Sequence, residues 1–377
     1  MKKIIILGAG MVGKAIAIDL CKKYKVKSVD IDQQSLSFLS QNYPVETEIL
    51  DVADEKLLSQ AIKDYDLVIS AVPGFLGLQT IEKVIQSKKD LVDISFLPEE
   101  VSHLNKIAKE HDVTVIMDCG VAPGVPNIIA GYYNERMKIN NFEYMVGGLP
   151  KLRKFPFEYK APFSPCDVIE EYTRPARYVE NGREVVKPAM SDIELMEFDH
   201  VGTLEAFNSD GLRSLIHTLS NIPNMKEKTL RYPGHIQMIK ALKAAGFFNK
   251  EPMKVKEQEF IPFDITTEIL FKDWKLNPED EEFTIMRIIM QGEEDSVNKE
   301  ISYDLYDVYD PINKISSMAR TTGFTATAAA NMILNNVFNE KGVFPPELVG
   351  KNSACFTYIL NYLKERNISY VKSEKIL

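Results

Sequence analysis

The hydrophobic pattern of the first 120 residues alternates between short apolar runs and segments with helical spacing. Every position of Ile4–Leu7 is apolar, which is typical of a strand buried on both faces of a parallel sheet. Lys14–Tyr24 then places apolar residues at helical spacing. Further strands are predicted at Val26–Val29, Val45–Leu50, Asp66–Val72, Leu91–Ile94 and Val113–Met117. Repeated β–α units of this kind predict an α/β fold with a doubly wound parallel sheet.

Beyond residue 122 the pattern changes to alternating strands and turn signals. Asn181-Gly182 predicts a hairpin, and Phe283–Met290 with Glu300–Val308 predicts an antiparallel pair. A helix is expected to begin at Ser209-Asp210. These elements predict an α+β second domain with a mostly antiparallel open sheet. We expect residues 1–122 and 316–377 to form a discontinuous first domain, and residues 123–315 to form a second domain for substrate binding and dimerisation.

Composition limits the classes of function. The 377 residues are 45% hydrophobic and carry a net charge of −9, which disfavours nucleic acid or an anionic membrane as the main partner. The four cysteines show no metal-ligand spacing, so we expect no metal site and a reducing, cytoplasmic location. The first apolar run is too short for a signal peptide, and the chain has no apolar run long enough to span a membrane.

A glycine motif follows the first predicted strand. Gly8-x-Gly10-x-x-Gly13 lies between that strand and a helix, and Asp30 ends the next strand 22 residues after Gly8. This is the Rossmann dinucleotide-binding fingerprint: glycines admit a tight turn and a pyrophosphate, while the acid binds a ribose. No Lys or Arg closely follows Asp30, so NAD is expected in preference to NADP. The predicted cofactor residues are Gly8, Ala9, Gly10, Met11, Val12, Gly13, Asp30, Ala71, Val72 and Pro73.

Several further motifs accompany the glycine motif along the chain. They are Asp118–Gly124, Gly147–Pro150, Gly202–Phe207, Lys228–His235 and the Met318–Glu347 tail. In these motifs and their order the chain resembles the saccharopine dehydrogenase-like family over nearly its whole length. Within the family the chain is most similar to the lysine 6-dehydrogenase group, although Ser209–Arg213, Lys160 and Arg174 depart from that pattern.

The resemblance implies NAD(P)-dependent oxidation of a C–N bond in an amino acid, such as the ε-amine of L-lysine. Two alternatives remain open. One is a saccharopine or carboxynorspermidine-type reductase that condenses an aldehyde with an amine. The other is a nucleotide-binding protein that has lost the chemistry. A small-molecule amino-acid substrate and a homodimer formed through the open sheet are expected.

Four residues of the second domain suit an amino-acid substrate. Arg231, beside a predicted helix start, is either a carboxylate-binding group or a surface residue. His235 is either functional or packed. Glu205 lies in an apolar stretch, so it either binds an ammonium or pairs with an arginine. Asp210 suits an ammonium or the first turn of the expected helix, with Arg213 as its partner.

Two residues are candidates for the general base, and a third is expected to assist. Asp118 follows the last strand of the first sheet, on the side where a nicotinamide would lie. Lys160 lies in an aromatic-rich segment, and burial there would lower the pKa of its amine, with Tyr159 assisting. Alternatively, Lys160 is a solvated lysine whose stem covers Tyr159.

Overall fold

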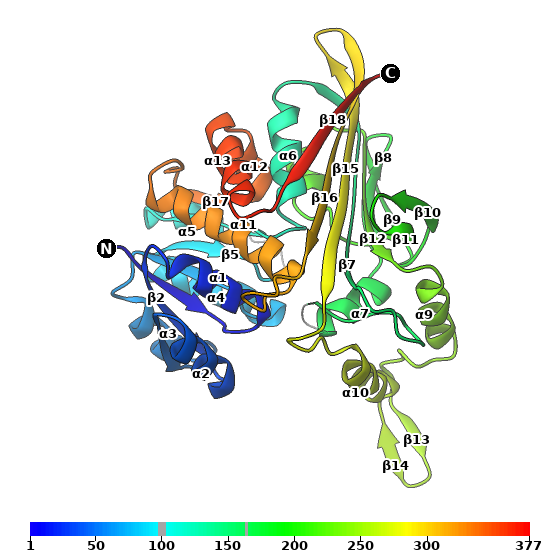
Figure 1. Ribbon diagram of the computed structural model, residues 1–377, viewed down its shortest axis with the longest axis horizontal. Helices are drawn as coiled ribbons and strands as arrows, with labels where there is room; N and C mark the ends of the chain where they lie inside the picture. Colours follow the sequence, from blue (N-terminus) through cyan, green and yellow to red (C-terminus); the bar gives the residue numbers. More distant parts are fainter. Residues whose placement is uncertain (97–102, 163–164) are drawn as a thin grey trace.

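The computed structural model describes residues 1–96, 103–162 and 165–377, which form two large sheets with helices packed around them and a separate two-stranded sheet (Figure 1). Within these residues the first sheet has seven parallel strands in the order β17-β6-β5-β4-β1-β2-β3. The strands are β1 Lys3–Leu7, β2 Lys25–Asp30, β3 Val45–Ile49, β4 Leu67–Ser70, β5 Asp90–Asp93, β6 Thr114–Ile116 and β17 Gly342–Phe344. The predicted doubly wound parallel sheet is confirmed.

Helices bury both faces of this sheet. Ile4 and Ile6 of β1 pack toward α1 and α11, whereas Ile5 and Leu7 pack toward α3, α4 and α5. This division follows from the alternation of side chains along a strand and explains the uninterrupted apolar run. The helices beside this sheet are α1 Met11–Leu20, α2 Gln33–Asn42, α3 Glu55–Ile62, α4 Gly74–Gln86, α5 Leu104–Glu110 and α11 Ser317–Leu334.

The second sheet is mostly antiparallel, as predicted. Its described strands run in the order β10-β11-β12-β7-β15-β16-β18, with the β8–β9 hairpin joined to β12. Only the β12–β7 pair is parallel among these. The bounds are β7 Lys138–Pro150, β8 Ala176–Glu180, β9 Arg183–Lys187, β10 Glu194–Phe198, β11 Gly202–Asn208, β12 Asn224–Arg231, β15 Glu282–Glu294, β16 Val297–Val308 and β18 Tyr370–Ile376.

The remaining elements surround the second sheet and the C-terminal segment. A hairpin of β13 Met253–Val255 and β14 Gln258–Phe260 projects from the body of the molecule (Figure 1). The helices are α6 Val125–Asn134, α7 Pro165–Thr173, α8 Leu215–Thr218, α9 His235–Ala244, α10 Pro262–Trp274, α12 Pro346–Gly350 and α13 Ser353–Lys364. In the described part of the chain, no helix combines the length and apolar character needed to cross a lipid bilayer.

The C-terminal segment contributes to both sheets. Helix α11 packs against α1, and β17 pairs with β6, but the final strand β18 pairs with β16 of the second sheet. The first domain was expected to include all of residues 316–377. The structure instead places the last strand of this segment, β18, in the second sheet. The proposed domain boundaries otherwise stay a prediction.

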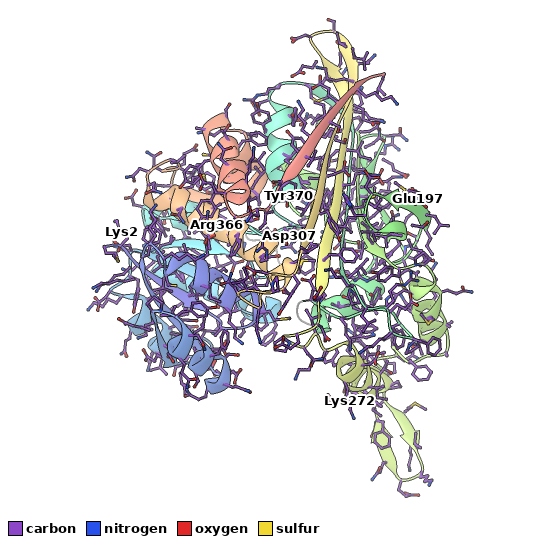
Figure 2. All side chains as sticks on the ribbon, viewed as in Figure 1. Lys2, Glu197, Lys272, Asp307, Arg366 and Tyr370 are labelled. Atoms are coloured by element: carbon purple, nitrogen blue, oxygen red, sulfur yellow. The ribbon has the colours of Figure 1, made fainter. Side chains whose placement is uncertain are left out.

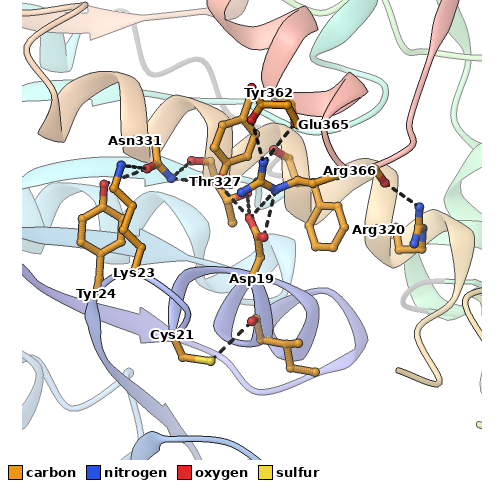
Figure 3. Close-up of polar contacts among 12 residues, drawn as sticks. Asp19, Cys21, Lys23, Tyr24, Arg320, Thr327, Asn331, Tyr362, Glu365 and Arg366 are labelled. Atoms are coloured by element: carbon orange, nitrogen blue, oxygen red, sulfur yellow. Dashed lines mark hydrogen bonds and ion pairs between the residues drawn. The ribbon is translucent and has the colours of Figure 1, made fainter. Parts of the chain in front are cut away.

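A buried polar network joins α1 to the C-terminal helices (Figure 3). Asp19 of α1 accepts hydrogen bonds from Arg366 Nε at 2.9 Å to each carboxylate oxygen. Thr327 of α11 and Tyr362 of α13 donate to the same carboxylate at 2.7 and 2.8 Å. The carbonyl of Arg366 in turn accepts from Arg320, which pairs with Asp307 of β16; Asp307 and Arg366 are labelled in Figure 2. The network therefore connects the glycine-motif helix to the second sheet.

Candidate active site

A cavity of about 580 Å³ lies between the carboxyl ends of the first sheet and one face of the second. The glycine motif and the loops after β2, β4 and β6 form one side. Strands β7 and β12, helix α7 and the loop after β11 form the other. Ligands of doubly wound sheets bind outside the carboxyl ends of the strands, so this cavity is the candidate site.

The glycine motif leaves room for a dinucleotide. Gly8 has φ +104°, and a Cβ there would lie 2.5 Å from the Ala71 carbonyl oxygen. A Cβ on Gly13 would lie 2.1 Å from the Gly8 carbonyl oxygen, so only glycine permits α1 to pack this closely. By contrast, a Cβ on Gly10 would meet nothing within 4 Å. No side chain caps α1, so its first N–H groups are available to a phosphate. These residues fit a dinucleotide.

The structure brings most of the predicted cofactor residues to the cavity. Ala9 does not line it, and its N–H donates to Asp30 Oδ2 at 2.5 Å. Those that line the cavity are Gly8, Gly10, Met11, Val12, Gly13, Asp30, Ala71, Val72 and Pro73.

Asp118 lies at the cavity wall and forms a two-pronged ion pair. It follows β6 with a left-handed backbone, at φ 50°, and its carboxylate accepts from Arg213 Nε at 3.2 Å and Nη2 at 3.1 Å. The Arg213 guanidinium also lies 5.0 Å from the ring centre of Phe96, a cation–π contact. Asp118 therefore orients Arg213, which was expected to pair with Asp210.

Asp210 is held by a different arginine from the one expected. Arg177 donates to it through its backbone N–H, Nε and Nη2 at 3.1, 2.9 and 3.0 Å. The helix expected to begin at Ser209-Asp210 is also wrong, because these residues lie in a loop and the first helix after them is α8 Leu215–Thr218. Asp210 does line the cavity.

Glu227 is a buried carboxyl group on the cavity wall. Its Oε2 accepts from Ser209 Oγ at 2.7 Å and from the Gly211 N–H at 3.0 Å. Ser209 Oγ also lies 2.7 Å from Thr229 Oγ1, and the Tyr144 hydroxyl donates to the Gly211 carbonyl at 2.6 Å. Burial raises the pKa of Glu227 to about 8, because the charged form loses water.

Arg231 lines the cavity but most of its N–H groups are already bonded. Its Nε donates to Tyr172 at 2.9 Å, Nη1 to the Leu230 carbonyl at 2.9 Å and Nη2 to Glu171 at 2.6 Å. Tyr172 in turn lies 2.9 Å from His235 Nε2. These contacts fix the guanidinium in one orientation.

His235 lies behind Arg231 and does not line the cavity. Its Nδ1 is 2.8 Å from the Phe157 carbonyl oxygen, which can only accept, so Nδ1 carries the proton and Nε2 accepts from Tyr172. Burial, with help from the Arg231 charge, lowers the pKa of His235 to about 3, and the ring is neutral. The structure therefore places His235 as a support for Tyr172 and Arg231.

Three other predicted site residues do not line the cavity. Tyr159 is buried beneath Arg231, with its hydroxyl 3.5 Å from Nη2, and burial holds its pKa well above the ordinary value. Lys160 donates to the Asp273 carbonyl. Glu205 accepts from the Ile236 N–H at 3.4 Å, at the start of α9. The roles assigned to these residues stay predictions.

The sequence analysis did not name the charged end of α7 or two residues of β12, Glu227 and Thr229. Glu170 and Glu171 line the cavity from α7, and Arg174 lines it directly after the helix. The alternation in Lys226–Arg231 carries a usable signal, because a strand there places Glu227, Thr229 and Arg231 on one face. Within residues 1–96, 103–162 and 165–377, no group of three or more His, Cys, Asp or Glu side chains is placed to hold a metal ion.

Comparisons with known proteins agree on the family. The chain is 23% identical over 448 residues to the mitochondrial alpha-aminoadipic semialdehyde synthase of Bos taurus, covering 100% of this chain and 48% of that protein. It is 27% identical to the NADP(+), L-glutamate-forming saccharopine dehydrogenase of Pyricularia oryzae, and the match covers 76% of this chain and 66% of that protein. The chain thus spans about half the length of the first of these relatives.

Two solved structures share the fold. Apo saccharopine dehydrogenase (L-Glu forming) from Saccharomyces cerevisiae superposes with a TM-score of 0.83 at 18% identity, covering 100% of both chains. The homospermidine synthase of Legionella pneumophila, in complex with NAD, has a TM-score of 0.71 at 12% identity and covers 99% of this chain and 91% of the other.

The expected preference for NAD over NADP is wrong. Residues 4–116 match the saccharopine dehydrogenase NADP binding domain, and relatives named for NADP(+) include those of Pyricularia oryzae and Saccharomyces cerevisiae. The expectation rested on the absence of a cation in the residues after Asp30. The structure places Lys14 of α1 within electrostatic range of Asp30 and Asp32, so a cation lies beside this strand end although it precedes it in sequence. Asp30 itself accepts from two backbone N–H groups, those of Ala9 and Asp32.

The second half of the chain gives the remaining evidence. Residues 120–368 match the saccharopine dehydrogenase C-terminal domain, which is well over half of the chain. This match includes β7, β12 and α7, the elements that form the second wall of the cavity. Together with the matching nucleotide-binding domain and the shared fold, it shows that the chain belongs to the saccharopine dehydrogenase family.

Proposed function

We propose that the chain is an NADP(H)-dependent oxidoreductase acting on a carbon–nitrogen bond of an amino acid. The observation that carries the proposal is one cavity lined on one side by the glycine motif and on the other by charged side chains of the second sheet. A nucleotide and a polar substrate would therefore meet in one enclosed space. A nicotinamide bound there would exchange hydride with a carbon attached to nitrogen.

In this proposal the charged residues of the cavity have different roles. Arg174, which lines the cavity near the ring of Phe96, binds a substrate carboxylate. Its Nη2 donates to Glu170, whereas Nε, Nη1 and Nη2 of Arg231 all have partners already. Asp118 and Arg213 form a fixed ion pair that orders the wall next to the nicotinamide side. Glu227 and its hydroxyl neighbours Ser209 and Thr229 lie on the opposite wall.

The reductive direction is a second candidate, in which an aldehyde and an amine condense and the imine is reduced. A specific match favours it: the chain is 22% identical to the carboxynorspermidine synthase of Vibrio alginolyticus, covering 85% of this chain and 82% of that protein. The two directions share the cavity and differ in the substrates offered.

Turnover assays test the proposal. Purified protein with NADP⁺ is offered L-saccharopine and L-lysine, and protein with NADPH is offered aldehyde and amine pairs, while absorbance of the reduced nucleotide is followed. We expect turnover in at least one arm, and absence of turnover in all arms would overturn the proposal. L-Lysine tests the specific activity implied by the resemblance.

Gly10→Ala tests the nucleotide site. Because the new Cβ meets no protein atom within 4 Å, the fold should be unchanged, whereas NADP(H) affinity should fall by about tenfold or more through contact with the pyrophosphate. Fluorescence titration with NADPH measures the affinity, and thermal unfolding checks the fold.

We also propose that the chain forms a homodimer through its broad second sheet. Light scattering should give twice the mass of the chain, and the mass of one chain would contradict it.

A further inference from the structure

Ion pairing separates five carboxylates that line the cavity, those of Asp118, Glu170, Glu171, Asp210 and Glu227, into two kinds. Four of them meet an arginine within ion-pair distance. The pairs are Asp118 with Arg213, Glu170 with Arg174, Glu171 with Arg231, and Asp210 with Arg177. Glu227 differs, because no Lys, Arg or His of the described residues lies within ion-pair distance of it.

The position of Glu227 directs its carboxyl group toward a ligand. Its Cα pairs with that of Tyr144 on the neighbouring strand, and both residues line the cavity. Ser209 and Gly211 both bond to Oε2, and in the described structure Oε1 accepts no hydrogen bond. A Cβ on Gly211 would lie 2.5 Å from the Glu227 Cδ, so the loop fits closely around this carboxyl group. One oxygen is therefore anchored and the other is left for a ligand.

The surroundings of Glu227 disfavour its charged form unless a cation lies against it. The residue is only 6% exposed, and after burial itself the carboxylates of Glu171 and Asp210 raise its pKa further, whereas Ser209 and the Gly211 N–H lower it. Tyr144 is a further titratable group that faces it, and the nearby Arg231 is bonded to Glu171. A buried carboxylate with these neighbours is stabilised most by a cation placed against it.

We propose that Glu227 is the residue that binds the substrate amine, which enters the cavity as an ammonium ion. This rests on the proposed function and adds the residue that recognises the amine. When the ammonium binds, Glu227 gives its proton to solvent, and an N–H of the ammonium donates to Oε1. The two charges then compensate each other within the cavity.

Calorimetry with a small amine tests the site without turnover. Protein saturated with NADP⁺ is titrated at constant ionic strength with n-propylammonium chloride, in two buffers of different ionisation enthalpy, at pH 7. We expect binding at millimolar concentrations with release of up to one proton. Neutral 1-propanol, which has the same chain, should bind at least tenfold more weakly. Failure of the wild-type protein to bind n-propylammonium would overturn the proposal.

Glu227→Gln removes the charge and keeps an acceptor for Ser209 and Gly211. We expect n-propylammonium affinity to fall about 10- to 100-fold and the proton release to disappear, since a charge-assisted hydrogen bond is lost. Glu227→Asp, which keeps the charge, should recover part of the affinity. NADP⁺ affinity should be unchanged in both variants, which shows that they fold. Unchanged amine affinity in Glu227→Gln would overturn the proposal.

Kinetics separates this inference from the proposed function. If the wild-type protein turns over an amine, Glu227→Gln should raise the KM for that amine at least tenfold with KM for the nucleotide unchanged. If turnover occurs and the amine KM does not change, the assignment of Glu227 fails and the proposed function stands. If no substrate is turned over, the proposed function fails, and the calorimetric result alone decides whether Glu227 is a cation site.

Discussion

Asp19 and Glu227 are both buried acids beside a cavity, yet their surroundings are opposite. Asp19 is 3% exposed and borders a smaller cavity of about 240 Å³. Arg366, Tyr362 and Thr327 all donate to its carboxylate. Glu227 has neutral donors only, on one oxygen. Burial beside a cavity therefore does not identify a ligand-binding acid; the difference lies in whether the protein supplies its own cation.

The two acids also lie on elements with different tasks. Asp19 is near the C-terminal end of α1, where the network in Figure 3 fastens the helix to α11 and α13. The opposite end of the same helix meets the glycine motif and the nucleotide side of the cavity. Full pairing of Asp19 suits a structural role, because a strained or mobile α1 would displace the nucleotide loop. A free oxygen on Glu227 suits a role in binding a ligand.

Asp19→Asn should produce the largest loss of stability. Asparagine cannot neutralise Arg366, and removal of one partner of a buried ion pair costs roughly 3 kcal/mol or more. We expect the free energy of unfolding, measured with urea, to fall by about 3 kcal/mol. Glu365→Gln is the matched control: Glu365 also pairs with Arg366, at 3.9 Å, but is exposed, so its loss should cost less than about 1 kcal/mol. Equal effects of the two substitutions would contradict the scaffold role.

Glu227→Gln should change how stability depends on pH. The folded pKa of about 8 lies above the ordinary value of 4.5, so the stability that neutral Glu227 contributes is fully present below about pH 4.5 and is lost as pH rises through 8. Glutamine has no such loss. The variant should therefore gain on the wild-type protein between pH 5 and 9, by roughly 1–3 kcal/mol.

Thermal unfolding of both proteins across that pH range measures the difference. Asp93 and Glu282, whose pKa values burial raises to about 7 and about 8, change stability in the same direction but are present in both proteins and cancel. A constant difference between the two proteins across the range would show that Glu227 is already charged and would remove this part of the contrast with Asp19.

Local sequence patterns made the first sheet predictable. They did not predict which charged side chains pair with each other. The strand, glycine motif and helix around Gly8–Gly13 follow from adjacent residues, and the structure has them where expected. Asp210 and Arg213 are three residues apart, so a helical pair was a reasonable expectation. The structure instead pairs each with a residue far away in sequence, Arg177 and Asp118.

Glu227 was missed for a related reason. Its side chain is adjacent to Lys226 and Lys228 in sequence, which suggests local neutralisation. In a strand, however, neighbouring side chains point to opposite faces, and Lys228 pairs with Glu143 and Glu194. A sequence therefore indicates which charges exist near a site, but only the sheet register shows which of them lack a partner.

Lys160→Met should have a small effect on catalysis. The ammonium of Lys160 donates to the Asp273 carbonyl and the residue does not line the cavity. We therefore expect kcat/KM to change by less than about threefold, with an unchanged pH profile, because loss of a general base would cost about 100-fold or more. Steady-state kinetics on the amine substrate measures it. A 100-fold loss would restore Lys160 as the base and would weaken the case for Glu227 as the group that meets the substrate nitrogen.

Glu347→Gln should have the smallest effect on amine binding. Glu347 is fully buried and, among the described residues, has no cationic partner, as for Glu227. Its two oxygens accept from Asn127 at 3.1 Å and Thr218 at 2.5 Å, and it does not line the cavity. If an available oxygen on the cavity wall is what marks Glu227, then Glu347→Gln should leave n-propylammonium affinity within about twofold. An equal loss in both variants would mean that neutralising any buried acid disturbs the site through the fold, and the available oxygen of Glu227 would no longer distinguish a ligand-binding acid from a structural one.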